Sequence, residues 1–334
     1  MGDVVTTPAV SVRAVLRDTG TDAVRGIAMV NLCFLLLTVG DVATMWVLPV
    51  AGVVGAMWGR GAIGALMVTV LASRHVGEGP RGLRRLLPVR FWLVMFRSAV
   101  HAISTVTWYV AWASSMALAD TYAVGYAAPL LMILLAVPML GERLTRRRVA
   151  ATSVGFAGML VMLRPGGDLW TPLTLLLLAG DAGMAVSRNL TRVLATTETP
   201  ECLTFWLMAA HLPVGALLLL LGFKMPGVDG AVVVAMLVLG VSNGVAHWLH
   251  ARASALAPVG ALAPYEYTGM IWAVLFGYLA FAQVPSWSTI GGAALVAFAG
   301  IDNFYREHRR RRAERSVPVG GAIAMVALAH RSDQ

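Results

Sequence analysis

Ten stretches of mostly apolar residues follow one another along this chain of 334 residues, separated by short polar segments. A helix needs about 20 apolar residues to cross the hydrocarbon core of a bilayer. The predicted spans are 26–48, 51–73, 91–113, 119–140, 149–163, 170–188, 203–222, 231–250, 258–281 and 286–304. The stretch 149–163 is short for a span unless it takes in part of its flanks.

Short motifs of the first half return in the second half at offsets of 138, 140 and 142 residues. The pairs are Ala117-Leu118-Ala119 with Ala255-Leu256-Ala257, Gly40-Asp41 with Gly180-Asp181, and Gly158 with Gly300. An odd number of spans per repeat turns the second copy upside down in the bilayer, and inverted repeats are typical of secondary transporters. We therefore expect an all-α integral membrane protein with ten transmembrane helices in two inverted five-helix repeats. The predicted parts are a cytoplasmic amino-terminal segment 1–25, repeats 26–163 and 170–304, and a basic cytoplasmic tail 305–334.

Composition and charge agree with a membrane protein. The chain is 58% hydrophobic and 13% charged, with a mean hydropathy of +0.74, whereas soluble domains carry roughly 25% charged residues. Of the 26 Lys and Arg residues, 22 fall on one predicted side of the bilayer, and only Arg164 and Lys224 fall on the other. The positive-inside rule then places both termini in the cytoplasm. We expect a multi-pass protein of the cytoplasmic (inner) membrane.

Two predicted spans carry polar residues along one helical face, at steps of three and four residues. The third span has Arg97, His101, Thr105, Trp108 and Trp112, and the eighth has Asn243, His247, His250 and Ser254. Such faces suit the interior of a helix bundle, where they line a cavity or form hydrogen bonds between helices. Arg97 lies near a helix end and can also reach outward to the interface.

Three acidic residues lie well away from the ends of predicted spans, where an ionisable group is costly and is by default a candidate functional group. Asp41 and Asp181 are repeat equivalents, and Glu266 lies next to Pro264 between two tyrosines. A buried carboxyl group can take up and release a proton during a transport cycle. Salt bridges or helix caps are the alternative, for example a pair of Asp41 with Arg60.

Several ordered motifs resemble the EamA module of the drug/metabolite transporter superfamily. The first half has Ala117 to Asp120, Ala128-Pro129, Leu140 to Leu144, Gly155 and Gly158. The second half has Ala263 to Thr268, Phe276 to Tyr278, Phe281 to Pro285, Gly291-Gly292 and Gly300. This resemblance, over about residues 25–304, implies ten helices around a central cavity that opens to each side in turn. Gln283 stands where the family usually has Glu, whereas the first half keeps Glu142, and we interpret this difference as structural.

The sequence thus predicts a secondary active transporter of a small metabolite, coupled to protons or working by exchange. Export of an amino-acid-like or other amphipathic compound is slightly favoured. The alternatives are uptake of a cofactor-like compound such as S-adenosylmethionine or riboflavin, and a membrane-embedded transferase. The chain has no phosphate-binding Gly-x-x-x-x-Gly-Lys-Ser/Thr loop, and we expect no enzyme activity, cofactor or metal. The expected partners are a small-molecule substrate and the lipid bilayer, not nucleic acid, and a homodimer is left open.

The candidate site residues follow from these patterns. The predicted substrate-binding residues are Arg97, His101, Trp108, Trp112, Tyr126, His247, Tyr265, Glu266 and Tyr267. The predicted proton-coupling residues are Asp41, Asp181 and Glu266.

Overall fold

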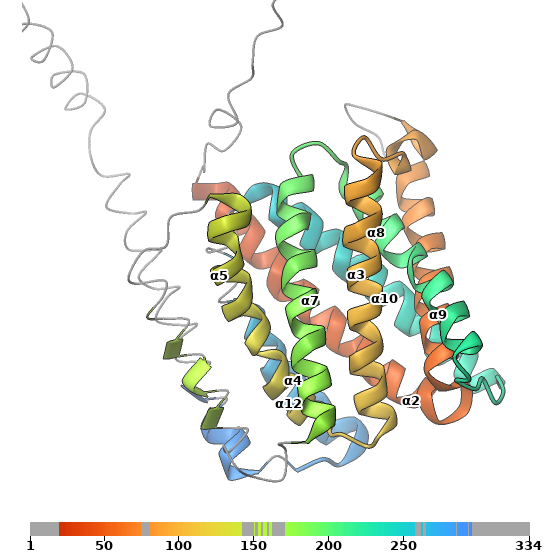
Figure 1. The fold of residues 1–334 in the computed structure, drawn as a ribbon, viewed down its shortest axis with the longest axis vertical. Coiled ribbons are helices and arrows are strands. Elements are labelled where there is room, and N and C mark those ends of the chain that lie inside the picture. Colours follow the sequence, from red (N-terminus) through yellow and green to blue (C-terminus); the bar gives the residue numbers. More distant parts are fainter. Residues whose placement is uncertain are drawn as a thin grey trace, which may run out of the picture.

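The computed structural model describes residues 20–74, 81–141, 150, 153–154, 156–158, 160–161, 171–257, 262, 265–284, 286–292 and 294–295. All regular secondary structure in these ranges is helical (Figure 1). The predicted spans 149–163 and 286–304 are described only in part. The tail 305–334, the motif residues Glu142, Pro264 and Gly300, and most of the amino-terminal segment lie outside the described residues.

The helices begin and end close to the predicted span limits. They are α2 (Gly20–Ser73), a 3₁₀ helix η1 (Gly82–Leu86), α3 (Phe91–Ala113), α4 (Leu118–Gly125), α5 (Ala127–Leu140), α7 (Pro172–Leu194), α8 (Pro200–Ala209), α9 (His211–Leu220), α10 (Gly230–Leu256) and α12 (Thr268–Phe281). Four segments of this described part are long and apolar enough to cross a membrane: Val24–Ser73, Leu118–Leu140, Pro200–Leu220 and Gly230–Leu256. The helices α3 and α7, each of 23 residues, are more polar because they carry buried charged and hydroxyl side chains.

The element α2 contains two helices that meet at Gly52, the second residue of the predicted span 51–73. Gly52 has φ 67° and ψ −177°, a conformation that side chains rarely adopt. A Cβ atom there would also lie 2.6 Å from the carbonyl oxygen of Lys224. Glycine therefore allows the chain to turn tightly here, next to the segment that precedes α10.

One predicted span ends too early, and two others keep their limits but are each divided into two helices. The helix α7 runs to Leu194, beyond the predicted limit at residue 188, so Arg192 also belongs to this helix. The fourth span is divided at Tyr126, one turn before Pro129, because proline has no N–H for the carbonyl of the preceding turn. The seventh span is divided at Ala210 into α8 and α9.

Helices from the two halves of the chain pack against one another. The helix α10 packs along α2, and α7 packs along α3 and α5 (Figure 1). Large apolar side chains such as Leu66, Trp92, Leu220 and Leu279 are exposed on the outside. An outer surface of this kind suits contact with lipid tails, whereas the buried polar residues point inward.

Candidate functional site

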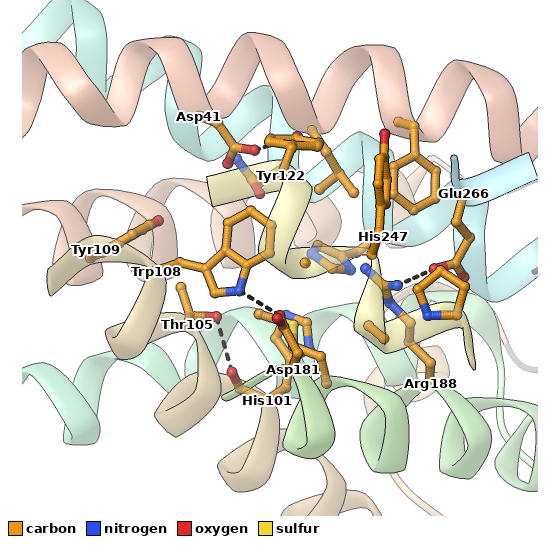
Figure 2. Close-up of a pocket in the computed structure, with 18 of the residues that line it drawn as sticks. Asp41, His101, Thr105, Trp108, Tyr109, Tyr122, Asp181, Arg188, His247 and Glu266 are labelled. Atoms are coloured by element: carbon orange, nitrogen blue, oxygen red, sulfur yellow. Dashed lines mark hydrogen bonds and ion pairs between the residues drawn. The ribbon is translucent and has the colours of Figure 1, made fainter. Parts of the chain in front are cut away.

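A cavity of about 70 Å³ lies inside the bundle, between helices of both halves. Residues of α2, α3, α4, α5, α7 and α10, together with Glu266, line it (Figure 2). Its polar and aromatic lining residues are Asp41, Arg60, His101, Thr105, Trp108, Tyr109, Trp112, Tyr122, Tyr126, Asp181, Arg188, Asn243, His247 and Glu266. We call this space the central cavity.

Two aromatic rings at one end of the central cavity are held between two carboxylates. The Tyr122 hydroxyl donates to Oδ2 of Asp41 at 2.6 Å, and the Trp108 indole N–H donates to Oδ1 of Asp181 at 3.0 Å. The two rings meet edge to face, with centroids 5.4 Å apart. Figure 2 shows this order, with Asp41 and Tyr122 above Trp108 and Asp181 below it. The helices α2, α3, α4 and α7 are thus joined through one set of contacts.

An ion pair lies at the other end of the central cavity. Arg188 of α7 donates to Oε2 of Glu266, which is almost fully buried (Figure 2). Oε1 of Glu266 lies 3.8 Å from Nε2 of His250. The guanidinium of Arg188 also lies over the ring of Phe34, 5.5 Å from its centroid. The two opposite charges of this pair largely compensate each other inside the bundle.

Arg60 contacts only neutral partners among the described residues. Its Nη1 donates to the Tyr109 hydroxyl at 3.3 Å, and its Nη2 lies 2.8 Å from Nε2 of His247. The pair of Asp41 with Arg60 that the sequence left open is therefore not a salt bridge here. The ring of His101 lies edge to face against His247, with centroids 4.9 Å apart, and neither of its nitrogens has a partner in the described part of the chain.

The central cavity contains several polar atoms that no described residue satisfies. They are Nε of Arg60, both ring nitrogens of His101, Nε1 of Trp112, Oδ2 of Asp181, Oδ1 of Asn243 and Oε1 of Glu266. Buried polar groups in proteins are nearly always hydrogen-bonded. A set of unsatisfied donors and acceptors around one cavity fits a polar ligand or bound water at this place.

The structure brings most of the predicted site residues together. Asp41, His101, Trp108, Trp112, Tyr126, Asp181, His247 and Glu266 line the central cavity. Three others do not. Tyr265 and Tyr267 lie outside its lining, and Tyr267 accepts the Tyr126 hydroxyl through its backbone carbonyl at 2.9 Å. Arg97 lies in a second, smaller cavity, where it is only 3% exposed and does not reach outward.

Sequence reasoning missed Arg188 as a site residue, because Arg188 is the last residue of the predicted span 170–188. Its spacing from Asp181 was the available signal. Residues seven apart lie two turns along the same helical face, so the face that carries Asp181 also carries Arg188. The charge of Arg188 had suggested the end of the span instead.

Gln283 has a structural role, as the sequence suggested. Its Oε1 accepts the backbone N–H of Leu118 at 3.1 Å, at the start of α4. The first N–H groups of a helix have no partner within the helix, so this side chain satisfies one of them. Gln283, from the second half of the chain, thus caps the start of α4 in the first half.

The described residues contain no group of three or more His, Cys, Asp or Glu side chains arranged to hold a metal ion. The fold and the central cavity define a multi-pass helical membrane protein with a buried polar and aromatic site. No family model matches the chain, so the resemblance to the EamA module rests on the motifs themselves.

The relatives of the chain are membrane transporters. It is 31% identical to the riboflavin transporter of Rhizobium johnstonii over 222 residues, which cover 66% of this chain and 72% of that protein. It is 27% identical to the riboflavin transporter of Brucella anthropi, over 78% of this chain and 92% of that protein. It is 25% identical to the S-adenosylmethionine uptake transporter of Rickettsia prowazekii, over 56% of this chain and 63% of that protein.

The fold is also found in a solved structure that is described only as the crystal structure of a protein. It superposes with a TM-score of 0.64 at 22% identity and covers 82% of this chain and 95% of that one. The chain belongs to the family of membrane transporters that includes the riboflavin transporter of Rhizobium johnstonii. These relatives are transporters and not enzymes, as expected from the sequence.

Proposed function

We propose that this protein is a secondary transporter that takes up a cofactor-like compound with a flat heteroaromatic ring across the cytoplasmic membrane. Riboflavin is the first candidate substrate and S-adenosylmethionine the second. The names of the relatives support uptake of such compounds better than the export that the sequence slightly favoured. Both termini face the cytoplasm in this proposal, as the distribution of arginines predicts.

The observation that carries the proposal is the pair of aromatic rings held between two carboxylates. Trp108 and Tyr122 are fixed by their bonds to Asp181 and Asp41. Rings held in this way offer faces and edges on which a flat heterocycle can stack. The unsatisfied donors and acceptors around them, such as Trp112 Nε1, match the polar edge of such a ring.

Alternating access supplies the mechanism. The central cavity, at about 70 Å³, is smaller than the pockets that usually hold ligands of this size. Substrate binding therefore requires the helices around the central cavity to move apart. Helices of both halves line it, so movement of one group of helices against the other opens it to either side in turn.

Asp181 is the proposed proton-coupling group. Its Oδ1 accepts from a neutral indole and its Oδ2 has no partner among the described residues. Protonation there changes the charge of the central cavity without leaving a cation unpaired. Asp41 is the second acid in this role. Glu266, which is already paired with Arg188, holds the helices in place and contacts the substrate.

The test is uptake of labelled riboflavin by proteoliposomes that contain the purified full chain, with an inward proton gradient. We expect saturable uptake that unlabelled riboflavin inhibits, and at least a ten-fold loss in Asp181→Asn. The control is Asp229→Asn, because Asp229 caps α10 outside the central cavity and Asn caps a helix equally well. A second set of vesicles with labelled S-adenosylmethionine ranks the two candidates. Absence of uptake for both compounds, or wild-type uptake in Asp181→Asn, would contradict the proposal or its site.

A further inference from the structure

A second cavity lies beside the central cavity and shares part of its wall. Phe34, Leu37, His101, Arg188 and His247 line both spaces. The second cavity continues toward the ends of α3 and α7 that carry Arg97 and Thr191. Its ionisable lining residues are two arginines, three histidines and Cys33, and no Asp or Glu is among the described residues that line it. The three acids that balance the central cavity are thus absent from this lining.

Arg97 is the unusual member of this lining, because it is buried without a counter-ion. Its Nε donates to Oγ1 of Thr191 at 3.0 Å and its Nη1 donates to the carbonyl of Leu203 at 2.7 Å. Both acceptors are neutral, and in the described part of the chain no carboxylate forms a salt bridge with it. The Nη2 group has no hydrogen-bond partner there either. A buried guanidinium in a membrane is costly unless a negative charge compensates it.

Two other arginines show how a carboxylate compensates a guanidinium in this protein, whereas the buried Arg60 has only the neutral partners Tyr109 and His247. Arg85 forms a salt bridge with Glu201 at 2.9 Å, and Arg188 pairs with Glu266. Both bridges use carboxylates that the chain itself supplies. Arg97 has no such partner among the described residues, and an anion bound from solution would supply a counter-charge for it.

Two further groups on the wall point to an occupant. The hydroxyl of Ser187, on a side chain only 1% exposed, has no hydrogen-bond partner among the described residues. Both ring nitrogens of His101, which lies on the wall that the two cavities share, lack partners as well. Together with Arg97, they offer hydrogen-bond donors to one small space. A neutral water molecule would satisfy the hydroxyl but would leave the charge of Arg97 uncompensated.

The size of the second cavity limits what can occupy it. It has room for about one water-sized sphere, about 10 Å³. A tetrahedral oxyanion such as phosphate is several atoms across and does not fit. A single-atom anion such as chloride is close to the size of a water molecule.

We propose that the second cavity binds one chloride-sized anion, held by Arg97 and Ser187. The anion would compensate the buried guanidinium and fix the helices α3 and α7 relative to each other. Its effect on transport rests on the proposed function. Because the two cavities share a wall, an occupied anion site stabilises the form in which this end of the bundle is closed.

The binding test uses the purified full chain in detergent, with chloride replacing gluconate at constant ionic strength. A ligand that binds only the folded protein raises its unfolding temperature in a saturable way. We expect this rise for the wild type with chloride and with bromide, but not with sulfate. The rise should be lost in Arg97→Gln. Arg252→Gln is the matched control, because Arg252 is an exposed cation over the ring of Trp248.

Ser187→Ala tests the site with a milder change, in case Arg97→Gln does not fold. Loss of one hydrogen bond should raise the half-saturating chloride concentration about five-fold. No saturable rise in the wild type, or an unchanged half-saturation in Ser187→Ala, would overturn the anion site.

Uptake of labelled riboflavin in chloride and in gluconate then separates the two proposals. Faster uptake in chloride by the wild type, with the same effect in Ser187→Ala only at about five-fold higher chloride, supports the role of the anion in transport. Equal uptake in both salts would contradict that role and leave the proposed function in place. No uptake in either salt would contradict the proposed function, whereas the binding result would still decide the anion site.

Discussion

The two ends of the central cavity hold their acidic side chains in different ways. At one end, Asp41 and Asp181 accept hydrogen bonds from a neutral hydroxyl and a neutral indole. At the other end, Glu266 is paired with the cation of Arg188. Removal of a paired acid leaves a buried cation behind, whereas an acid bonded to a neutral donor can change its charge without that cost. The first end therefore suits proton transfer and the second suits the positioning of helices.

The two aspartates are alike in packing but differ in how completely they are bonded. Each follows a glycine that contacts a helix of the other half: a Cβ on Gly40 would lie 2.1 Å from Nδ2 of Asn243, and one on Gly180 would lie 2.0 Å from Oγ1 of Thr107. Oδ2 of Asp181 has no partner among the described residues, while Oδ2 of its counterpart accepts a bond of 2.6 Å. Asp181 is thus the acid with room for another hydrogen-bond donor.

The largest expected effect on stability comes from breaking the ion pair of Arg188 with Glu266. Glu266→Gln leaves the half-buried charge of Arg188 without compensation, and we expect the free energy of unfolding to fall by about 3 kcal/mol. Thermal unfolding of the purified protein measures it. The double variant with Arg188→Met should regain most of the loss. A single variant as stable as the wild type would show that the two ends do not differ as described.

At the other end, Asp181→Asn should separate function from stability. The amide can still accept the indole N–H of Trp108, so we expect unfolding to change by less than about 1 kcal/mol. Uptake driven by a proton gradient should fall at least ten-fold, while exchange of labelled for unlabelled substrate should be retained. The ratio of the two fluxes is the measurement. Equal loss of both fluxes would indicate a role in substrate binding and not in proton coupling.

Removal of the Tyr122 hydroxyl, which donates to Asp41, should have a smaller effect on stability and uptake. Tyr122→Phe removes its bonds to Asp41 and to Thr38, the second at 3.0 Å, but keeps the ring against Trp108. We expect a loss of about 1 kcal/mol in stability and a several-fold higher half-saturating substrate concentration. Urea unfolding and concentration-dependent uptake measure the two quantities. A variant with unchanged uptake would limit the role of this hydroxyl to stability.

The smallest effect concerns an acid introduced outside the central cavity. Gln283→Glu keeps an acceptor for the N–H of Leu118 and adds a negative charge at the start of α4. The positive end of the helix dipole favours this charge, so we expect a gain of about 0.5 kcal/mol and unchanged uptake. Gln283→Ala, which loses the bond, should be less stable than the wild type. Lower stability of Gln283→Glu would contradict this account.

The sequence predicted the helical segments well because apolar length and periodicity depend only on local pattern. It placed eight of the predicted spans on described helices, and the polar stripe of the third span indeed faces inward. Breaks at Tyr126 and Ala210 were harder to place, since a helix that ends and restarts keeps the same apolar composition. The positions of Arg188 and Arg192 were misjudged because a basic residue normally marks the end of a span.

The spacing of polar residues along a helix did not predict which cavity a side chain enters or which residue it contacts. Arg97 and His101 lie on one helical face, yet only His101 reaches the central cavity. Four residues along a helix correspond to about 6 Å, enough to move a side chain from one space to the next. The sequence also suggested Arg60 for Asp41, whereas the structure gives Asp41 the hydroxyl of a tyrosine from α4. Such pairings depend on helix packing and not on spacing within a helix.

The position of Cys33 has a practical consequence for following the transport cycle. Both cysteines of the chain are buried and free, and Cys33 lies on the wall of the second cavity. A thiol reagent in solution should therefore modify it only when that end of the bundle opens. Cys33 can therefore report on the transport cycle in the wild-type protein. The rate at which a maleimide labels Cys33, with Cys33→Ala as the control, would measure how often the end of the bundle with the second cavity is open.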